Sequence, residues 1–187
     1  MLSDDLEEAD RLYANGNAVD AFPTYKAAAL AGSSQCQRIV GWMYYLGEGV
    51  GKDILAAESW FKKSAVSGDI EGKFGWGCVE LSLCKYEEAQ RIFGELAQAR
   101  FPPAVFRLGW MEEKGCGRDV NIQLALKWYR EAASLGNLEA EKRFAVMTLK
   151  GWRGVVRVPV GFFLYVRFFF RLVVVAIDGS HRIELLR

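Results

Sequence analysis

The sequence is poor in the residues from which catalytic and metal sites are usually built. Its 187 residues include one histidine, His181, which excludes most nucleophile–histidine–acid triads and metal sites made of several histidines. The four cysteines form no Cys-x-x-Cys pair, a pattern that favours buried free thiols over disulfides or a zinc site. We therefore expect no catalytic residues, no metal and no cofactor, and a protein that is not an enzyme.

The chain also lacks a net charge. Lys and Arg number 24 and Asp and Glu 23, which leaves +1, so no overall positive field would attract nucleic acid. The N-terminus is acidic and shows no basic region followed by an apolar run, so we expect no secretory signal and a cytoplasmic location. Half of the residues (51%) are hydrophobic and a quarter (25%) charged, which is typical of a globular protein.

Acidic residues are missing from one long stretch, between Glu141 and Asp178. Residues 151–187 carry six Arg, two acids and no Lys, a net charge of +4. The preceding residues therefore hold 18 of the 24 basic and 21 of the 23 acidic residues, a net charge of −3. The sequence thus predicts a mildly acidic body, residues 1–150, followed by an apolar, arginine-bearing segment, residues 151–187.

The body repeats itself. When the chain is shifted by 68 residues, Val40-Gly-Trp-Met43 falls on Leu108-Gly-Trp-Met111, which indicates a tandem repeat. The period divides into steps of 36, 32 and 36 residues. These steps connect a column of alanines and a column of aromatic residues: Ala21, Ala57, Ala89, Ala125 and Tyr25, Phe61, Phe93, Tyr129.

The spacing within a unit predicts amphipathic helices. Ala57, Trp60, Phe61 and Ser64 fall at i, i+3, i+4 and i+7, and glycines stand where left-handed helix ends are expected, at Gly32, Gly68 and Gly136. We expect helices at 4–15, 18–31, 35–46, 53–67, 71–83, 86–99, 103–114, 121–135 and 138–150. Pro23 either delays the start of the second helix or kinks it. A helical hairpin with one uncovered apolar face must stack on the next, so the pattern predicts an all-α solenoid.

Two segments carry a more specific pattern. The first consists of Val40-Gly41, Tyr44, Gly47, Gly49-Val50, Asp53, Ala57, Trp60-Phe61, Lys63, Ala65 and Gly68. A second copy runs from Ala104 to Gly136, with Glu112 in place of the tyrosine and Asn121 in place of the aspartate. This pattern resembles the Sel-one-like repeat (SLR) family, a branch of the tetratricopeptide superfamily. The units fall at about 4–33, 34–69, 70–101 and 102–137, with a half unit at 138–150.

The resemblance implies a right-handed superhelix whose concave surface serves as a scaffold for protein complexes, without a common catalytic site. In bacteria such proteins often serve envelope, polysaccharide or secretion pathways. We therefore expect a non-enzymatic adaptor that binds another protein or peptide in its groove.

The first helix of each unit is expected to line this groove. Trp42 and Trp110 occupy equivalent positions, and Trp, Tyr and Arg dominate binding hot spots. The expected partner-binding residues are Arg38, Trp42, Tyr45, Phe74, Phe106, Trp110, Glu113 and Lys142. The alternative is that the aromatic residues seal the packing between units.

The C-terminal segment contains a run of 20 residues, 158–177, that is apolar except for two arginines and would be about 30 Å long as a helix. Two arginines near its middle make a membrane span marginal. On a helix the arginines form a narrow stripe opposite Phe162, Tyr165 and Phe169. Three interpretations remain: an interfacial or re-entrant anchor, a single-pass span with snorkelling arginines, or a helix docked on the solenoid or on a partner. The expected membrane-contact residues are Arg157, Phe162, Phe163, Tyr165, Arg167, Phe169 and Arg171.

Together these features predict a cytoplasmic adaptor of a bacterial-type cell, peripheral to or anchored at the inner membrane through its C-terminal helix, in contact with anionic lipid. The alternative is a soluble interaction or immunity-type protein whose C-terminal helix packs on the solenoid. A hydrolase would need an acid–base–nucleophile cluster in the groove, which one histidine in the C-terminal segment makes hard to assemble.

Overall fold

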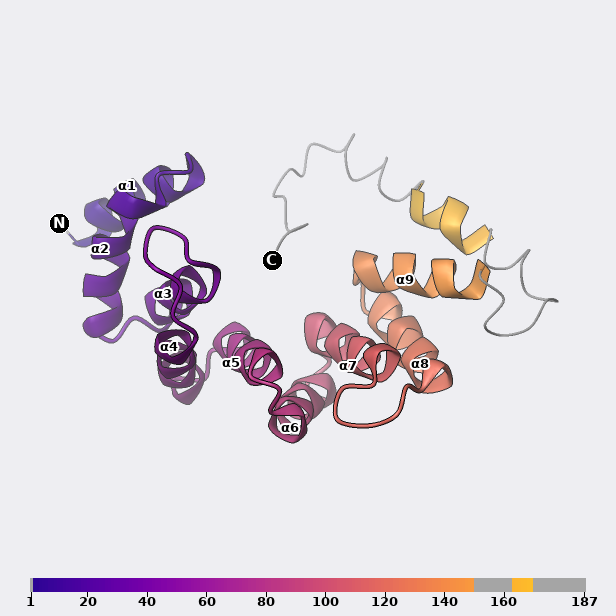
Figure 1. Cartoon of the computed structure of the whole chain (residues 1–187). Helices are drawn as coiled ribbons and strands as arrows, with labels where there is room; N and C mark the ends of the chain where they lie inside the picture. Colours follow the sequence, from indigo (N-terminus) through magenta and orange to yellow (C-terminus); the bar gives the residue numbers. More distant parts are fainter. Residues whose placement is uncertain (1, 150–162, 170–187) are drawn as a thin grey trace. The chain divides into compact units, whose positions relative to one another are not determined.

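The computed structural model describes residues 2–149 and 163–169, and every regular element within these ranges is a helix. Nine helices are labelled in Figure 1, and a tenth, short helix spans 163–169. The nine are α1 (Leu2–Ala14), α2 (Ala18–Leu30), α3 (Ser34–Leu46), α4 (Ile54–Val66), α5 (Ile70–Ser82), α6 (Tyr86–Gln98), α7 (Pro102–Lys114), α8 (Ile122–Ser134) and α9 (Leu138–Leu149).

These bounds confirm the expected all-α repeat fold. Each of the nine predicted helices is present, and their ends differ from the prediction by two residues at most. The agreement has a physical basis, because one apolar stripe of period 3.6 and clear end signals set each helix. Of the predicted C-terminal segment, 151–187, the structure describes only residues 163–169, so the predicted membrane contacts Arg157, Phe162 and Arg171 lie outside the described residues.

The chain divides into two compact units, Met1–Leu96 and Ala97–Arg187. In the first unit, α1 to α5 pack each on the next, and α3 also packs on α5. In the second unit, α7 packs on α8 and α8 on α9. A buried core lies in each, around Tyr25 and Met43 in the first and around Leu126 and Tyr129 in the second. The boundary predicted at residue 150 stays a prediction.

Close approach between helices depends on the aromatic column and the glycines beside it. Phe61 is fully buried, and a Cβ atom at Gly41 would lie 2.8 Å from its ring; one at Gly75 would lie closer still. In the second unit a Cβ atom at Gly109 would lie 2.9 Å from the ring of Tyr129. The predicted pairing of small residues with one aromatic per unit therefore describes how the hairpins pack.

Every helix from α1 to α8 is followed within two residues by a residue with positive φ. Six are glycines, among them the predicted Gly32, Gly68 and Gly136, with φ of 102°, 85° and 97°. The other two are Cys84 and Arg100, both at φ 58°, which follow α5 and α6. The 70–101 unit thus keeps the left-handed helix ends but has no glycine there, the residue that adopts this conformation without strain.

Two smaller expectations need correction. Pro23 lies inside α2, so the predicted late start of this helix is wrong. Proline has no backbone N–H, and the carbonyl of Val19 therefore lacks its helical hydrogen bond. Both residues are exposed, so water can hydrate this carbonyl. The four cysteines are thiols, and Cys36 and Cys78 are buried as expected, but Cys84 is exposed and Cys116 is half-buried. Cys84 is exposed because it belongs to the turn after α5.

Candidate partner-binding surface

Arg38 on α3 is held by the start of α5. Its Nε lies 3.2 Å from Asp69 Oδ2 and its Nη1 lies 2.9 Å from Glu71 Oε2. Asp69 also accepts hydrogen bonds from the backbone N–H groups of Glu71 and Gly72 and caps α5. The guanidinium, with 16% of the side chain exposed, therefore joins two neighbouring first helices within the molecule.

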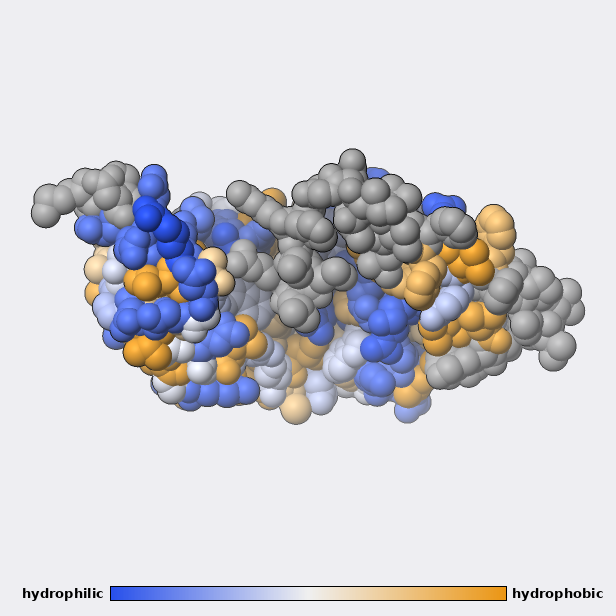
Figure 2. All heavy atoms as spheres, turned by 90° about the horizontal axis from the view of Figure 1, so that it is seen from above, coloured by the Kyte–Doolittle hydropathy of each residue, from blue (hydrophilic) through white to orange (hydrophobic). Residues whose placement is uncertain are grey.

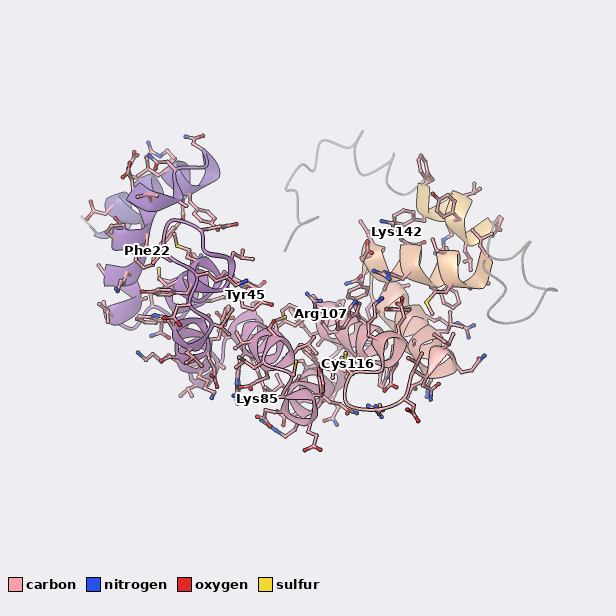
Figure 3. All side chains as sticks on the ribbon, in the orientation of Figure 1. Phe22, Tyr45, Lys85, Arg107, Cys116 and Lys142 are labelled. Atoms are coloured by element: carbon pink, nitrogen blue, oxygen red, sulfur yellow. The ribbon has the colours of Figure 1, made fainter. Side chains whose placement is uncertain are left out.

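Trp42 and Tyr45 form an aromatic pair on the same helix. The Trp42 ring meets Tyr45 edge-on (centroids 5.5 Å apart, 87°) and Phe61 at 5.0 Å and 74°. Tyr45 reaches from α3 towards α5 (Figure 3), where its hydroxyl lies 2.7 Å from Ser82 Oγ. Both rings are half-buried. Part of the Trp42 ring therefore seals the packing between helices, as the alternative interpretation expected, and the rest of the ring is exposed to solvent.

Two further predicted aromatic residues pack in the same way. Phe74 on α5 is half-buried with its ring 5.7 Å from Phe93, and Phe106 on α7 is half-buried with its ring 5.5 Å from Tyr129. Trp110, also on α7, is half-buried. All the predicted aromatic residues thus lie on the first helix of a repeat unit, and each side chain is partly exposed.

The charged residues of α7 and α9 form a linked group. Tyr129 donates a hydrogen bond of 2.6 Å to Glu113 Oε2, and Arg143 Nη1 lies 3.1 Å from Glu113 Oε1. Burial, and then the hydrogen bond to this carboxylate, raise the pKa of Tyr129 well above its ordinary value. Lys142, half exposed on α9 (Figure 3), pairs at 3.7 Å with Glu139, which is equally exposed.

The eight predicted residues therefore form one group in each compact unit. Those on α3 and α5 are brought together by the packing of these helices, and those on α7 and α9 by the Arg143–Glu113 ion pair. Seven are half-buried and Lys142 is exposed, so none lies in the core. Arg38 and Glu113 hold the helices together through their charges.

Sequence reasoning missed a cluster around Glu80. This carboxylate, 2% exposed on α5, accepts a hydrogen bond of 2.6 Å from Trp76 Nε1 and pairs with Lys85 at 3.2 Å. The hydrogen bond to Glu80 raises the pKa of Lys85. Lys62 Nζ lies 3.9 Å from Glu80 Oε1 and 2.5 Å from Glu58 Oε1. The hydrogen bond that Lys62 donates to Glu58 lowers the pKa of this carboxyl group.

The register of the repeats contained a signal for this cluster. Steps of 36, 32 and 36 residues connect Tyr44, Glu80, Glu112 and Thr148, so two units carry glutamate where the repeat pattern has tyrosine. Both glutamates are buried, and each pairs with a cation that follows its helix: Lys85 at 3.2 Å and Arg118 at 2.9 Å.

Within the described residues, no group of three or more His, Cys, Asp or Glu could hold a metal ion.

The chain consists of helical hairpins of 32 to 36 residues in which small residues of one helix pack against an aromatic ring of another. These features define a repeat protein of the tetratricopeptide-like class. The repeats themselves are Sel1 repeats: the pattern of that family matches residues 34–69 and 102–137. The predicted Sel-one-like repeats are thereby confirmed in these two segments, and Sel1 repeats are in general scaffolds for protein interaction.

Solved structures share the fold. A Sel1 repeat protein from Oxalobacter formigenes superposes with a TM-score of 0.68 at 24% identity, over 87% of this chain and 68% of that one. A protective antigen of uropathogenic Escherichia coli with an SLR fold superposes with a TM-score of 0.66 at 23% identity, over 96% of this chain and 42% of that one.

A curated relative is the chitin synthase regulator SKT5 of Saccharomyces cerevisiae, 28% identical over 60% of this chain. The chain spans only 17% of the length of that relative.

Proposed function

We propose that this protein is a non-enzymatic adaptor that binds another protein or peptide on the first helices of its repeats. The observation that carries the proposal is the pair Trp42 and Trp110, two half-buried indoles at equivalent positions of the two Sel1 repeats. An indole held by its neighbours offers a large contact area at a small entropic cost, which suits a binding hot spot.

The surroundings of Trp42 support this role. Phe61 and Tyr45 both contact its ring, and Arg38 is fixed one turn earlier by Asp69. Lys52 Nζ lies 5.9 Å above the Tyr45 ring and adds a cation at the edge of the aromatic pair. A preorganised aromatic surface with charges at its rim fits an extended peptide that carries apolar side chains and an occasional carboxylate.

We further propose that the C-terminal segment holds the adaptor at the cytoplasmic face of a membrane. In helix 163–169, Phe163, Tyr165 and Phe169 are 68%, 36% and 57% exposed. Viewed from above in Figure 2, apolar residues gather at the end of the molecule where this helix lies. Exposed aromatic rings next to arginines suit the interface of an anionic bilayer. Among the residues that the structure describes, none of the helices is both long and apolar enough to cross a bilayer.

The yeast relative suggests the setting of such an adaptor. It is described as a regulator of chitin synthase, which supports a role of this chain beside a polysaccharide-forming enzyme in an envelope pathway.

The soluble alternative also rests on a specific observation. Phe168 is 7% exposed and Arg167 pairs with Glu141, so part of the C-terminal segment packs on the repeats. An interaction or immunity-type protein without a membrane role would show this contact as well.

The partner surface is tested by affinity capture with full-length protein as bait. Trp42→Ala/Trp110→Ala is expected to lose the captured protein while helicity stays unchanged. The matched control is Leu55→Ala/Gln123→Ala, which changes equivalent positions on the second helices of the same two repeats. If Trp42→Ala/Trp110→Ala captures the partner as well as the wild type and the control do, the binding site does not lie at these positions of the first helices.

The membrane role is tested by flotation with anionic liposomes. The full-length chain is expected to float, and a chain that ends at Lys150 is expected to stay at the bottom. Identical behaviour of the two chains would rule out the tether and favour the soluble alternative.

A further inference from the structure

The short helix at residues 163–169 packs on α9. Phe168 is 7% exposed, and Arg167 Nε lies 3.6 Å from Glu141 Oε1. Figure 1 shows the short helix, drawn in gold, alongside α9. The Glu141 side chain is 7% exposed, so Arg167 reaches a carboxylate that is almost removed from water.

The position of Phe168 continues a column of buried residues in the second helices of the hairpins. Steps of 36, 32, 36 and 36 residues connect Ala28, Ser64, Leu96, Ala132 and Phe168. All five are buried, with exposures of 5%, 0%, 3%, 0% and 7%. Phe168 therefore occupies the place that the inward residue of a fifth second helix would take.

The ion pair of Arg167 repeats a contact of the third hairpin with the charges exchanged. There Lys73 of α5 pairs with Glu95 of α6 at 2.6 Å, and this hydrogen bond lowers the pKa of Glu95. Glu141 follows Lys73 by 68 residues, one step of 32 and one of 36, and Arg167 follows Glu95 by 72, two steps of 36. The extra four residues equal the difference between the long and the short interhelix loop. The same two repeat positions thus meet in both hairpins.

We infer that helix 163–169 is the second helix of a fifth hairpin and acts as a latch: it docks on α9, and an anionic membrane surface competes with α9 for it. The competition rests on the membrane role proposed above. Docking and membrane binding compete for two side chains. A lipid phosphate that takes the Arg167 Nε displaces it from Glu141, and the Phe168 ring cannot be buried against the repeats and in the acyl region at once.

The test compares full-length variants in two measurements: partition onto vesicles of phosphatidylcholine with or without phosphatidylglycerol, and amide hydrogen exchange of residues 163–169. Glu141→Lys places a cation opposite Arg167, and Glu141→Gln removes the charge with little change of shape. Glu139→Lys is the matched control, because it adds the same charge to a half-exposed position of α9 that has no ion pair with Arg167.

Glu141→Lys is expected to speed exchange of the helix and to tighten binding to phosphatidylglycerol vesicles by about three- to tenfold over Glu139→Lys, the range for loss of one ion pair whose arginine is 65% exposed. Glu141→Gln is expected to act in the same direction, more weakly. Glu141→Lys/Arg167→Glu recreates the order of the Lys73–Glu95 pair, so it is expected to restore slow exchange and to bind these vesicles less tightly than the wild type.

Binding of Glu141→Lys and Glu141→Gln no tighter than that of Glu139→Lys, with a wild type that binds, would overturn the latch and leave the membrane role intact. Failure of every protein to bind would overturn the membrane role together with the competition. In that case fast exchange in Glu141→Lys and slow exchange in the double variant would still support the fifth hairpin.

Discussion

The Sel1 repeats at 34–69 and 102–137 share one backbone arrangement but fill an equivalent inner position differently. In the first, the ring of Tyr44 meets Phe22 edge-on at 5.5 Å, and Lys26 donates a hydrogen bond of 3.5 Å to its hydroxyl. In the second, Glu112 stands at this position, 3% exposed, with Arg118 Nη2 2.9 Å from its Oε1.

The difference shows what this position contributes. Tyr44 contacts two residues of α2 and so ties its repeat to the preceding hairpin. Glu112 instead ties α7 to the loop that follows it, because Arg118 belongs to that loop. In these two repeats the position holds a filled volume and an oxygen that meets a cation, and neither feature demands an aromatic ring.

Removing the aromatic centre of a repeat is expected to have the largest effect. Phe61 is fully buried between Gly41 and Gly75, which cannot move in to fill the space. Phe61→Ala should lower the free energy of unfolding by about 3–5 kcal/mol, measured by urea denaturation. A loss below about 1 kcal/mol would show that the glycines do not enclose this ring.

The comparison of Tyr44 and Glu112 is tested by removing the cation from each. Arg118→Ala leaves a buried carboxylate without its partner and should cost about 2–3 kcal/mol, less than a fully buried pair because Arg118 is 41% exposed. Lys26→Ala leaves a neutral hydroxyl and should cost less than about 1 kcal/mol. Chemical denaturation of both variants checks the order.

Glu112→Tyr in the Arg118→Ala background serves as the control, since it restores the repeat pattern and removes the unpaired charge. Stability is expected to recover. If Arg118→Ala and Lys26→Ala cost the same, the two positions are equivalent and the comparison above is wrong.

Tyr129→Phe makes the aromatic centre of the second Sel1 repeat resemble that of the first. It removes the hydrogen bond to Glu113, whose pairing with Arg143 remains, and should cost about 1 kcal/mol. The raised pKa of Tyr129 means that its contribution is complete below the unfolded-state pKa of about 10 and is lost as the pH rises above it. The difference between wild type and variant should therefore shrink above pH 10 in thermal melts.

The smallest effect is expected in the unit between the two Sel1 repeats. Cys84 adopts φ 58° after α5, where the equivalent turns use glycine. Cys84→Gly should raise the free energy of unfolding by about 0.5–1 kcal/mol, because glycine reaches this conformation without strain. Leu83→Gly, one residue earlier at φ −83°, is the control and should destabilise.

The sequence predicted much of the fold and less of the candidate surface. The columns at Ala57 and Phe61 set both the period and the helix bounds, because one buried stripe leaves few ways to pack. Trp42 was placed correctly on a first helix, but its contact with Phe61 could not be derived from spacing. Arg38 and Glu113 were expected to face a partner, and their ion pairs within the molecule depend on Asp69 and Arg143, 31 and 30 residues away.

By itself the sequence determined the repeat, its period and the places where helices end, since these follow from local periodicity and backbone preference. Only the tertiary structure decided which charges are already paired. Glu80, Glu112 and Glu141 are all buried, and each meets its cation on another element or loop. A charge has no preferred direction along the chain, so its partner is known only when the helices have packed.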